Sequence, residues 1–146
     1  MRKCVIFLLA PILILPLLSS CREVEPLAPE EPNAVLLSPS EGSTLPPGDV
    51  QVRIYLQNFT IVENTGQPNK TNEGHAIYYL DVTAPIAAGI AATAVPGTFV
   101  ASAETSYTWP NVPPGQHVFT VQLVNNDDTP LLPPVAVRAN VVVKNR

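Results

Sequence analysis

The chain has 146 residues, 17 prolines and two cysteines, and its formal net charge is −4 with no run of basic residues. This charge pattern excludes a positive patch for nucleic acid, and we expect no nucleic-acid partner. Charged residues make up only 14% of the sequence. The abundance of proline, valine and threonine favours short strands joined by turns over long helices.

Residues 1–20 have the pattern of a secretory signal peptide. Two positive charges directly after Met1 precede an uncharged apolar run, residues 4–18. A membrane-spanning helix needs about 20 apolar residues, so this run is too short for a permanent span. Two prolines within the run weaken a helix further. We therefore expect export of the protein and removal of residues 1–20.

The sequence Leu-Ser-Ser-Cys, which ends at Cys21, resembles the lipobox of bacterial lipoproteins. In that family the thiol receives a diacylglyceryl group, the preceding peptide bond is cut, and the new amine is acylated. The resemblance implies a protein anchored in the cell membrane or outer membrane through acyl chains on Cys21 and facing away from the cytoplasm. Two or three acyl chains anchor stably, whereas one chain binds only marginally. Because Arg22 rather than aspartate follows, we expect transfer to an outer membrane where the cell has one.

The mature chain divides into a tether and one domain. Residues 21–33 are acidic and rich in proline, which is typical of an extended, semi-rigid spacer. Loss of the signal peptide takes the net charge from −4 to −6 and removes Cys4, so we expect no disulfide in the domain, residues 34–146. A domain of this size buries enough surface to fold without one.

Apolar and polar residues alternate along several short segments of the domain, as in half-buried strands. Residues 84–95 are alanine-rich and interrupted by proline and glycine, which leaves open a helical turn, a loop or an irregular edge strand. Long polar loops are predicted at residues 63–74 and 125–134. Strands are predicted at residues 34–37, 50–56, 75–82, 98–101, 104–109, 117–124 and 135–143.

Short strands at this spacing predict an all-β fold, an antiparallel sandwich of about seven strands. The run PPGQHVFTVQL, which ends at Leu123, resembles a turn and penultimate strand of the immunoglobulin-like and fibronectin-type-III-like domains of exported bacterial proteins. The chain lacks the inter-sheet cysteine pair of antibody domains, and Trp109 is not in the third strand. The resemblance implies an immunoglobulin-like spacer, adhesion unit or ligand-binding module, not a catalyst.

The run EGHAIYYLD resembles a stretch of exported bacterial domains of unknown function, in which Gly-His-x-His precedes an aliphatic strand that ends in aspartate. Gly74, His75 and Asp81 match, but Ile77 replaces the second histidine. His75 and Asp81 are therefore possible ligand contacts. We predict no metal site and no cofactor, because a first-row metal needs at least three nitrogen, sulfur or oxygen ligands.

His117 has the same parity as the apolar residues of its strand, which indicates a partly buried, hydrogen-bonded ring. If the strands that begin at His75 and His117 are antiparallel neighbours, the two histidines lie at opposite ends, about 20 Å apart. They then cannot share an ion. Asp127 and Asp128 indicate turn chemistry rather than a calcium site, because EF-hand spacing is absent.

Two leucines near a loop tip, Leu131 and Leu132, are flanked by prolines and predict an apolar contact surface for an envelope protein or polysaccharide. Tyr107 and Trp109 share one strand face, which favours a core position over a platform for sugar rings. Taken together, the sequence predicts a non-enzymatic binding or structural module without a catalytic residue. The alternative is a periplasmic metal or small-ligand carrier centred on His75.

Overall fold

The computed structural model of this chain describes residues 30–63 and 67–145. The predicted signal peptide, Cys21 and most of the tether lie outside these residues. Within them, no helix is long and apolar enough to span a membrane. The strands are β1 (Asn33–Ser38), β2 (Thr44–Leu45), β3 (Gly48–Gln57), β4 (Thr60–Ile61), β5 (Glu73–Leu80), β6 (Phe99–Ser102), β7 (Ser106–Val112), β8 (Gly115–Val124) and β9 (Pro130–Val143).

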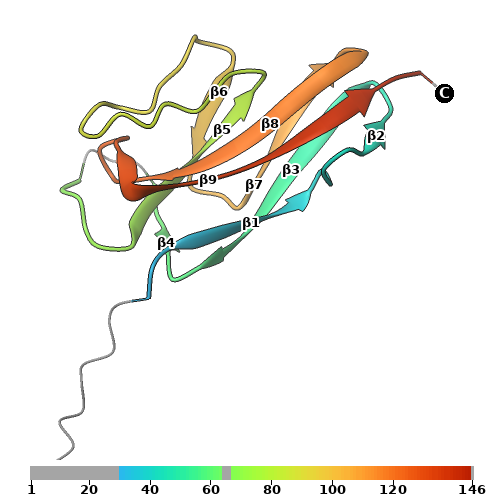
Figure 1. The fold of residues 1–146 in the computed structure, drawn as a ribbon. Coiled ribbons are helices and arrows are strands. Elements are labelled where there is room, and N and C mark those ends of the chain that lie inside the picture. Colours follow the sequence, from blue (N-terminus) through green and yellow to red (C-terminus); the bar gives the residue numbers. More distant parts are fainter. Residues whose placement is uncertain (1–29, 64–66, 146) are drawn as a thin grey trace, which may run out of the picture.

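Two sheets pack face to face (Figure 1). The smaller sheet has the antiparallel order β1-β3-β7, and the larger has the order β2-β9-β8-β5-β4, with β6 also paired to β5. The strands β9, β8, β5 and β6 are antiparallel to one another in this order, whereas the two-residue strands β2 and β4 pair in parallel with β9 and β5. An immunoglobulin-like sandwich divides its strands in this way. The first, second and fifth of the longer strands, which are β1, β3 and β7, form one sheet, and the remaining longer strands form the other. The predicted all-β sandwich is confirmed, with seven described strands of four or more residues.

The main core lies between the two sheets and follows the predicted alternation. Val50, Val52 and Ile54 of β3 are buried, whereas the residues between them are exposed. Trp109 is also buried and its ring meets Tyr107 edge-on, with the ring centroids 5.2 Å apart, so the core position predicted for this pair is confirmed. The larger sheet contributes to the same core Ala76, Tyr78, Phe119, Val121, Leu123, Ala139, Val141 and Val143.

Residues 81–98 form an irregular loop that covers the outer face of the larger sheet (Figure 1). Ala84 and Ala92 of this loop are buried against Ile77 and Tyr79 of β5. The alanine-rich segment at residues 84–95, for which the sequence allowed a helical turn, a loop or an irregular edge strand, thus forms a loop. Because it gives the larger sheet a second apolar layer, both faces of β5 are buried from Gly74 to Tyr79.

The predicted loop at residues 125–134 is shorter than expected, because β9 begins at Pro130. The turn between β8 and β9 spans residues 125–129 and is closed by the Asn125 amide, which donates to the Thr129 carbonyl. The prolines at the start of β9 were read as loop residues. They fit a strand here because β2 pairs only with Val142 and Val143 of β9. The first half of β9 is therefore an edge of the sheet, and a proline, which has no amide hydrogen, loses no strand hydrogen bond on that side.

Candidate functional site

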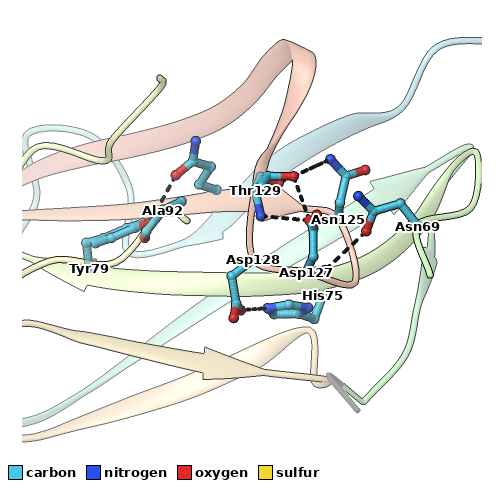
Figure 2. Close-up of polar contacts among 9 residues, drawn as sticks. Asn69, His75, Tyr79, Ala92, Asn125, Asp127, Asp128 and Thr129 are labelled. Atoms are coloured by element: carbon cyan, nitrogen blue, oxygen red, sulfur yellow. Dashed lines mark hydrogen bonds and ion pairs between the residues drawn. The ribbon is translucent and has the colours of Figure 1, made fainter. Parts of the chain in front are cut away.

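His75 lies near the start of β5 and its side chain is 1% exposed. Its Nε2 atom is 2.8 Å from Oδ1 of Asp128, in the turn between β8 and β9 (Figure 2). Asp128 has a φ of 65°, a conformation that aspartate tolerates better than most residues. Among the described residues, the buried Nδ1 atom of His75 has no hydrogen-bond partner. The imidazole therefore joins β5 to the turn through one nitrogen.

The same turn is braced by side chains on either side of Asp128. Oδ1 of Asp127 accepts hydrogen bonds from the Thr129 hydroxyl at 2.6 Å and from the Thr129 amide at 3.1 Å. The Asp127 amide donates to Oδ1 of Asn69 at 3.1 Å (Figure 2). These contacts, above all the bond from the Thr129 hydroxyl, hold the pKa of Asp127 below its usual value. The two aspartates thus serve different partners, which fits turn chemistry rather than a calcium site.

Asn126 connects the turn to the segment that precedes β5. Its side chain is 1% exposed, and its Nδ2 atom donates to the Pro68 carbonyl at 3.0 Å and to Oε1 of Glu73 at 3.1 Å. Glu73 also pairs with Lys70. Hydrogen bonds from Asn126 and Lys70 hold the pKa of Glu73 below its usual value. Two loops distant in sequence are therefore held as one polar layer at this end of the sandwich.

His117 lies at the other end of the larger sheet. Its Nδ1 atom is 2.7 Å from Oδ2 of Asp81, and its Nε2 atom is 2.9 Å from the Pro113 carbonyl oxygen. Oδ1 of Asp81 accepts from the Val118 amide at 2.8 Å. Carboxylate and carbonyl oxygens are both acceptors, so each nitrogen of the ring faces an acceptor. The buried, hydrogen-bonded ring predicted for His117 is confirmed.

His75 and Asp81 do not form one site. β5 pairs antiparallel with β8, His75 opposite Val124 and Leu80 opposite Phe119, so Asp81 lies at the far end of β5 beside His117. His75 and Asp81 stay separate possible ligand contacts, because each histidine pairs with an aspartate outside its own strand. The antiparallel pairing places the two histidines toward opposite ends of the sheet, as predicted. In the described part of the chain, no three histidine, cysteine, aspartate or glutamate side chains group closely enough to hold a metal ion.

Leu131 and Leu132 separate, and the predicted two-leucine surface is wrong for Leu131. Leu131 is 8% exposed and packs in the main core, whereas Leu132 is 72% exposed. Successive side chains of a strand point to opposite faces, and both residues lie in β9. Leu132 borders a groove of about 350 Å³ that is also lined by residues 30–32, where the chain enters the domain.

A second exposed apolar surface was missed from sequence. Residues 82–103 contain no charged side chain, and in the loop at 81–98 three large aliphatic residues are about two-thirds exposed. These residues are Ile86, Ile90 and Val95. The signal in the sequence is the absence of charge over this length.

No protein-family model matches this chain, and no curated protein matches its sequence. Among solved structures, an engineered protein is similar at 13% identity and a TM-score of 0.44, over 81% of this chain and 21% of that protein. The fibronectin(III)-like modules of CbhA from Clostridium thermocellum are similar at 13% identity and a TM-score of 0.45, over 78% of this chain and 47% of that chain. The chain thus spans less than half the length of either structure.

Proposed function

We propose that this protein is a non-enzymatic binding or structural module of a bacterial envelope, held by acyl chains on Cys21. It faces away from the cytoplasm on the cell membrane or outer membrane and contacts an envelope protein or polysaccharide. The single observation that carries the proposal is the structural role of both histidines. Each one is hydrogen-bonded to an aspartate and holds a loop at one end of an immunoglobulin-like sandwich.

The hydrogen bonds of the two histidines support a module without catalysis. A serine or threonine nucleophile needs a base within hydrogen-bond reach. Among the described residues, the hydrogen-bond partners of the two rings are carboxylates and one backbone carbonyl, and the remaining ring nitrogen has none. A rigid sandwich that fixes its end loops is, by contrast, the usual architecture for presenting a binding surface.

The anchor is supported by sequence: the charged start, the short apolar run and Leu-Ser-Ser-Cys occur in the order that lipoprotein export requires. The test is metabolic labelling with a palmitate analogue in a bacterial host. We expect label in the wild-type protein and none in Cys21→Ser, with Cys4→Ser as the matched control that keeps its label. Label retained in Cys21→Ser would refute the anchor.

The binding role is tested by partner capture from membranes. The wild-type protein and an unrelated lipoprotein are crosslinked in cells and purified in parallel. We expect at least one envelope protein or polysaccharide to be enriched with the wild type. An identical set of weak contaminants in both samples would argue for a purely structural role.

One observation favours the alternative carrier function. Metal-ligating histidines usually donate their second ring N–H to a carboxylate, as His75 does to Asp128, and its Nδ1 atom lacks a partner among the described residues. The purified protein is titrated with Cu²⁺ and with Zn²⁺. Tight, stoichiometric binding that His75→Gln abolishes and His117→Gln retains would establish the carrier. Equal metal binding by the two variants would exclude the carrier function.

A further inference from the structure

The loop at 81–98 presents its aliphatic side chains outward from a fixed base. The Tyr79 hydroxyl, which carries one hydrogen, lies within hydrogen-bond distance of both the Ala92 carbonyl and Oε1 of Gln122. Nε2 of Gln122 donates to the Pro85 carbonyl at 2.9 Å. With Ala84 and Ala92 buried beneath, the loop is held at two points, and its exposed aliphatic residues remain on the outside.

The loop reaches the end of the sandwich where the tether enters. The Ala92 amide donates to the Asp128 carbonyl at 2.8 Å, which ties the loop to the turn between β8 and β9. Asn125 of that turn and Leu132 line the same groove as residues 30–32. Asn72 and Asn58 fix this entry by donating to the carbonyls of Glu30 and Glu31. Figure 1 shows the turn and loop at the end opposite the C-terminus.

We propose that this end of the domain lies on the lipid bilayer that holds Cys21, with its exposed aliphatic side chains inserted among the lipids. We call these side chains the apolar rim; they are Ile90, two residues before Ala92, and Leu132. The inference rests on the proposed anchor, because nine residue steps from Cys21 to Glu30 extend at most about 30 Å. The tether thus keeps the rim at a high effective concentration near the membrane.

The composition of the rim selects lipid over the other possible occupants. Protein interfaces are enriched in tyrosine, tryptophan and arginine, and sugar rings stack on aromatic side chains, but the rim consists of isoleucine and leucine. Residues 82–103 carry no charge, so insertion of Ile90 requires no desolvation of an ion within its own segment. The charged residues that line the groove beside Leu132, namely Glu30, Glu31 and Lys70, remain at the level of the headgroups. The segment at 82–103 is also without basic residues, so its contact depends on apolar burial and not on anionic headgroups.

The test measures the depth of individual rim positions in the acylated protein. Cys4 leaves with the signal peptide and the Cys21 thiol is consumed by acylation, so an introduced cysteine is the single reactive thiol. Ile90→Cys and Leu132→Cys are labelled with an environment-sensitive fluorophore after reconstitution into uncharged vesicles that contain nitroxide lipids. Lys144→Cys, exposed at the opposite end, is the matched control. The melting temperature of each variant confirms that it is folded.

We expect the lipid nitroxides to quench about half or more of the fluorescence at positions 90 and 132, and little at 144. The quenching should persist at high salt, because it depends on apolar contact. Equal, weak quenching at all three positions in acylated protein would overturn the docked rim and leave the anchor intact. A protein whose mass shows no acyl chains would overturn both proposals.

Discussion

His75 and Asp128 are 53 positions apart in sequence, yet Nε2 of the histidine and Oδ1 of the aspartate are 2.8 Å apart. The histidine is fully buried and the aspartate side chain is 30% exposed, so the carboxylate connects the interior of the sheet to the turn above it. A buried donor that loses its acceptor destabilises a protein by about 1–3 kcal/mol. The pair therefore contributes to the stability of the end loops.

Replacing Asp128 tests this contribution. Asp128→Gly permits the φ of 65° but removes the acceptor, and we expect it to lower the free energy of unfolding by about 1–3 kcal/mol. Asp128→Asn keeps an acceptor oxygen and tolerates the same φ, so its loss should be clearly smaller. Urea unfolding of the three proteins gives the comparison. Equal losses in both variants would show that the contact with His75 is not what stabilises the turn.

The two leucines at the start of β9 should behave differently. Leu131 is in the core, so Leu131→Ala should lower the free energy of unfolding by about 2–5 kcal/mol. Leu132→Ala should change it by no more than about 0.5 kcal/mol, because its side chain is 72% exposed. Thermal or urea unfolding distinguishes them. A large loss for Leu132→Ala would mean that this residue is covered in solution, and it would remove Leu132 from the apolar rim.

The sequence predicted most of the fold because alternation records burial residue by residue. The predicted strand at residues 50–56 corresponds to β3, and that at residues 117–124 to β8, with end shifts of two residues or fewer. Proline misled the prediction for the start of β9, since edge position depends on the partner strand and not on the local sequence. Burial of Leu131 was missed for the same reason.

The site was less predictable than the fold. The partners of His75 and His117 lie on other elements, 53 and 36 positions away, and spacing along one strand carries no information about them. The motif that contains His75 and Asp81 therefore did not reveal that His75 pairs with Asp128 and Asp81 with His117. The loop at 81–98 has no repeating pattern to reveal which face it covers. Buried alanines and hydrogen bonds to Tyr79, Gln122 and Asp128, not alternation, hold it in place.

Acid should destabilise the turn between β8 and β9 through Asp127. Its pKa is lowered in the folded protein, chiefly by the bond from the Thr129 hydroxyl. The stabilisation is therefore present above the unfolded value of about 3.8 and is lost as pH falls through the lower folded value. We expect Asp127→Asn to weaken the dependence of unfolding free energy on pH below about pH 4. Thr129→Val removes the donor and should weaken it similarly; an unchanged slope in both would contradict this account.

Base should destabilise the outer layer through Tyr79. Burial, and secondarily the negative charge of Asp128, raise the pKa of its hydroxyl well above the ordinary value. The stabilisation is full below the unfolded pKa of about 10 and declines as pH rises above it, because only the unfolded chain then releases the proton. Tyr79→Phe should show a smaller loss of unfolding free energy between about pH 9 and pH 11 than the wild type. Equal losses would place the base sensitivity elsewhere, with Tyr78, whose pKa is also raised by burial, as the next residue to test.

Gly74, directly before His75, lies where two strands and a carbonyl group converge. A Cβ atom added there would be 1.9 Å from the Val124 carbonyl oxygen and 3.1 Å from the Phe59 ring. Real side chains do not approach a backbone atom so closely, so β5 or β8 must move apart at the level of His75. We expect Gly74→Ala to lower the free energy of unfolding by about 3 kcal/mol or more, or to prevent folding.

Gly89 provides the control for this substitution. It has a φ of +70°, and no described atom lies within 4 Å of an added Cβ. Gly89→Ala should therefore add only the strain of an alanine in the left-handed region, about 1 kcal/mol. Urea unfolding measures both variants, and the one-dimensional NMR spectrum reports whether Gly74→Ala is folded. If the two substitutions lower stability equally, β5 and β8 separate without a large penalty at Gly74. The close approach of the strands then plays no part in holding His75 against the turn.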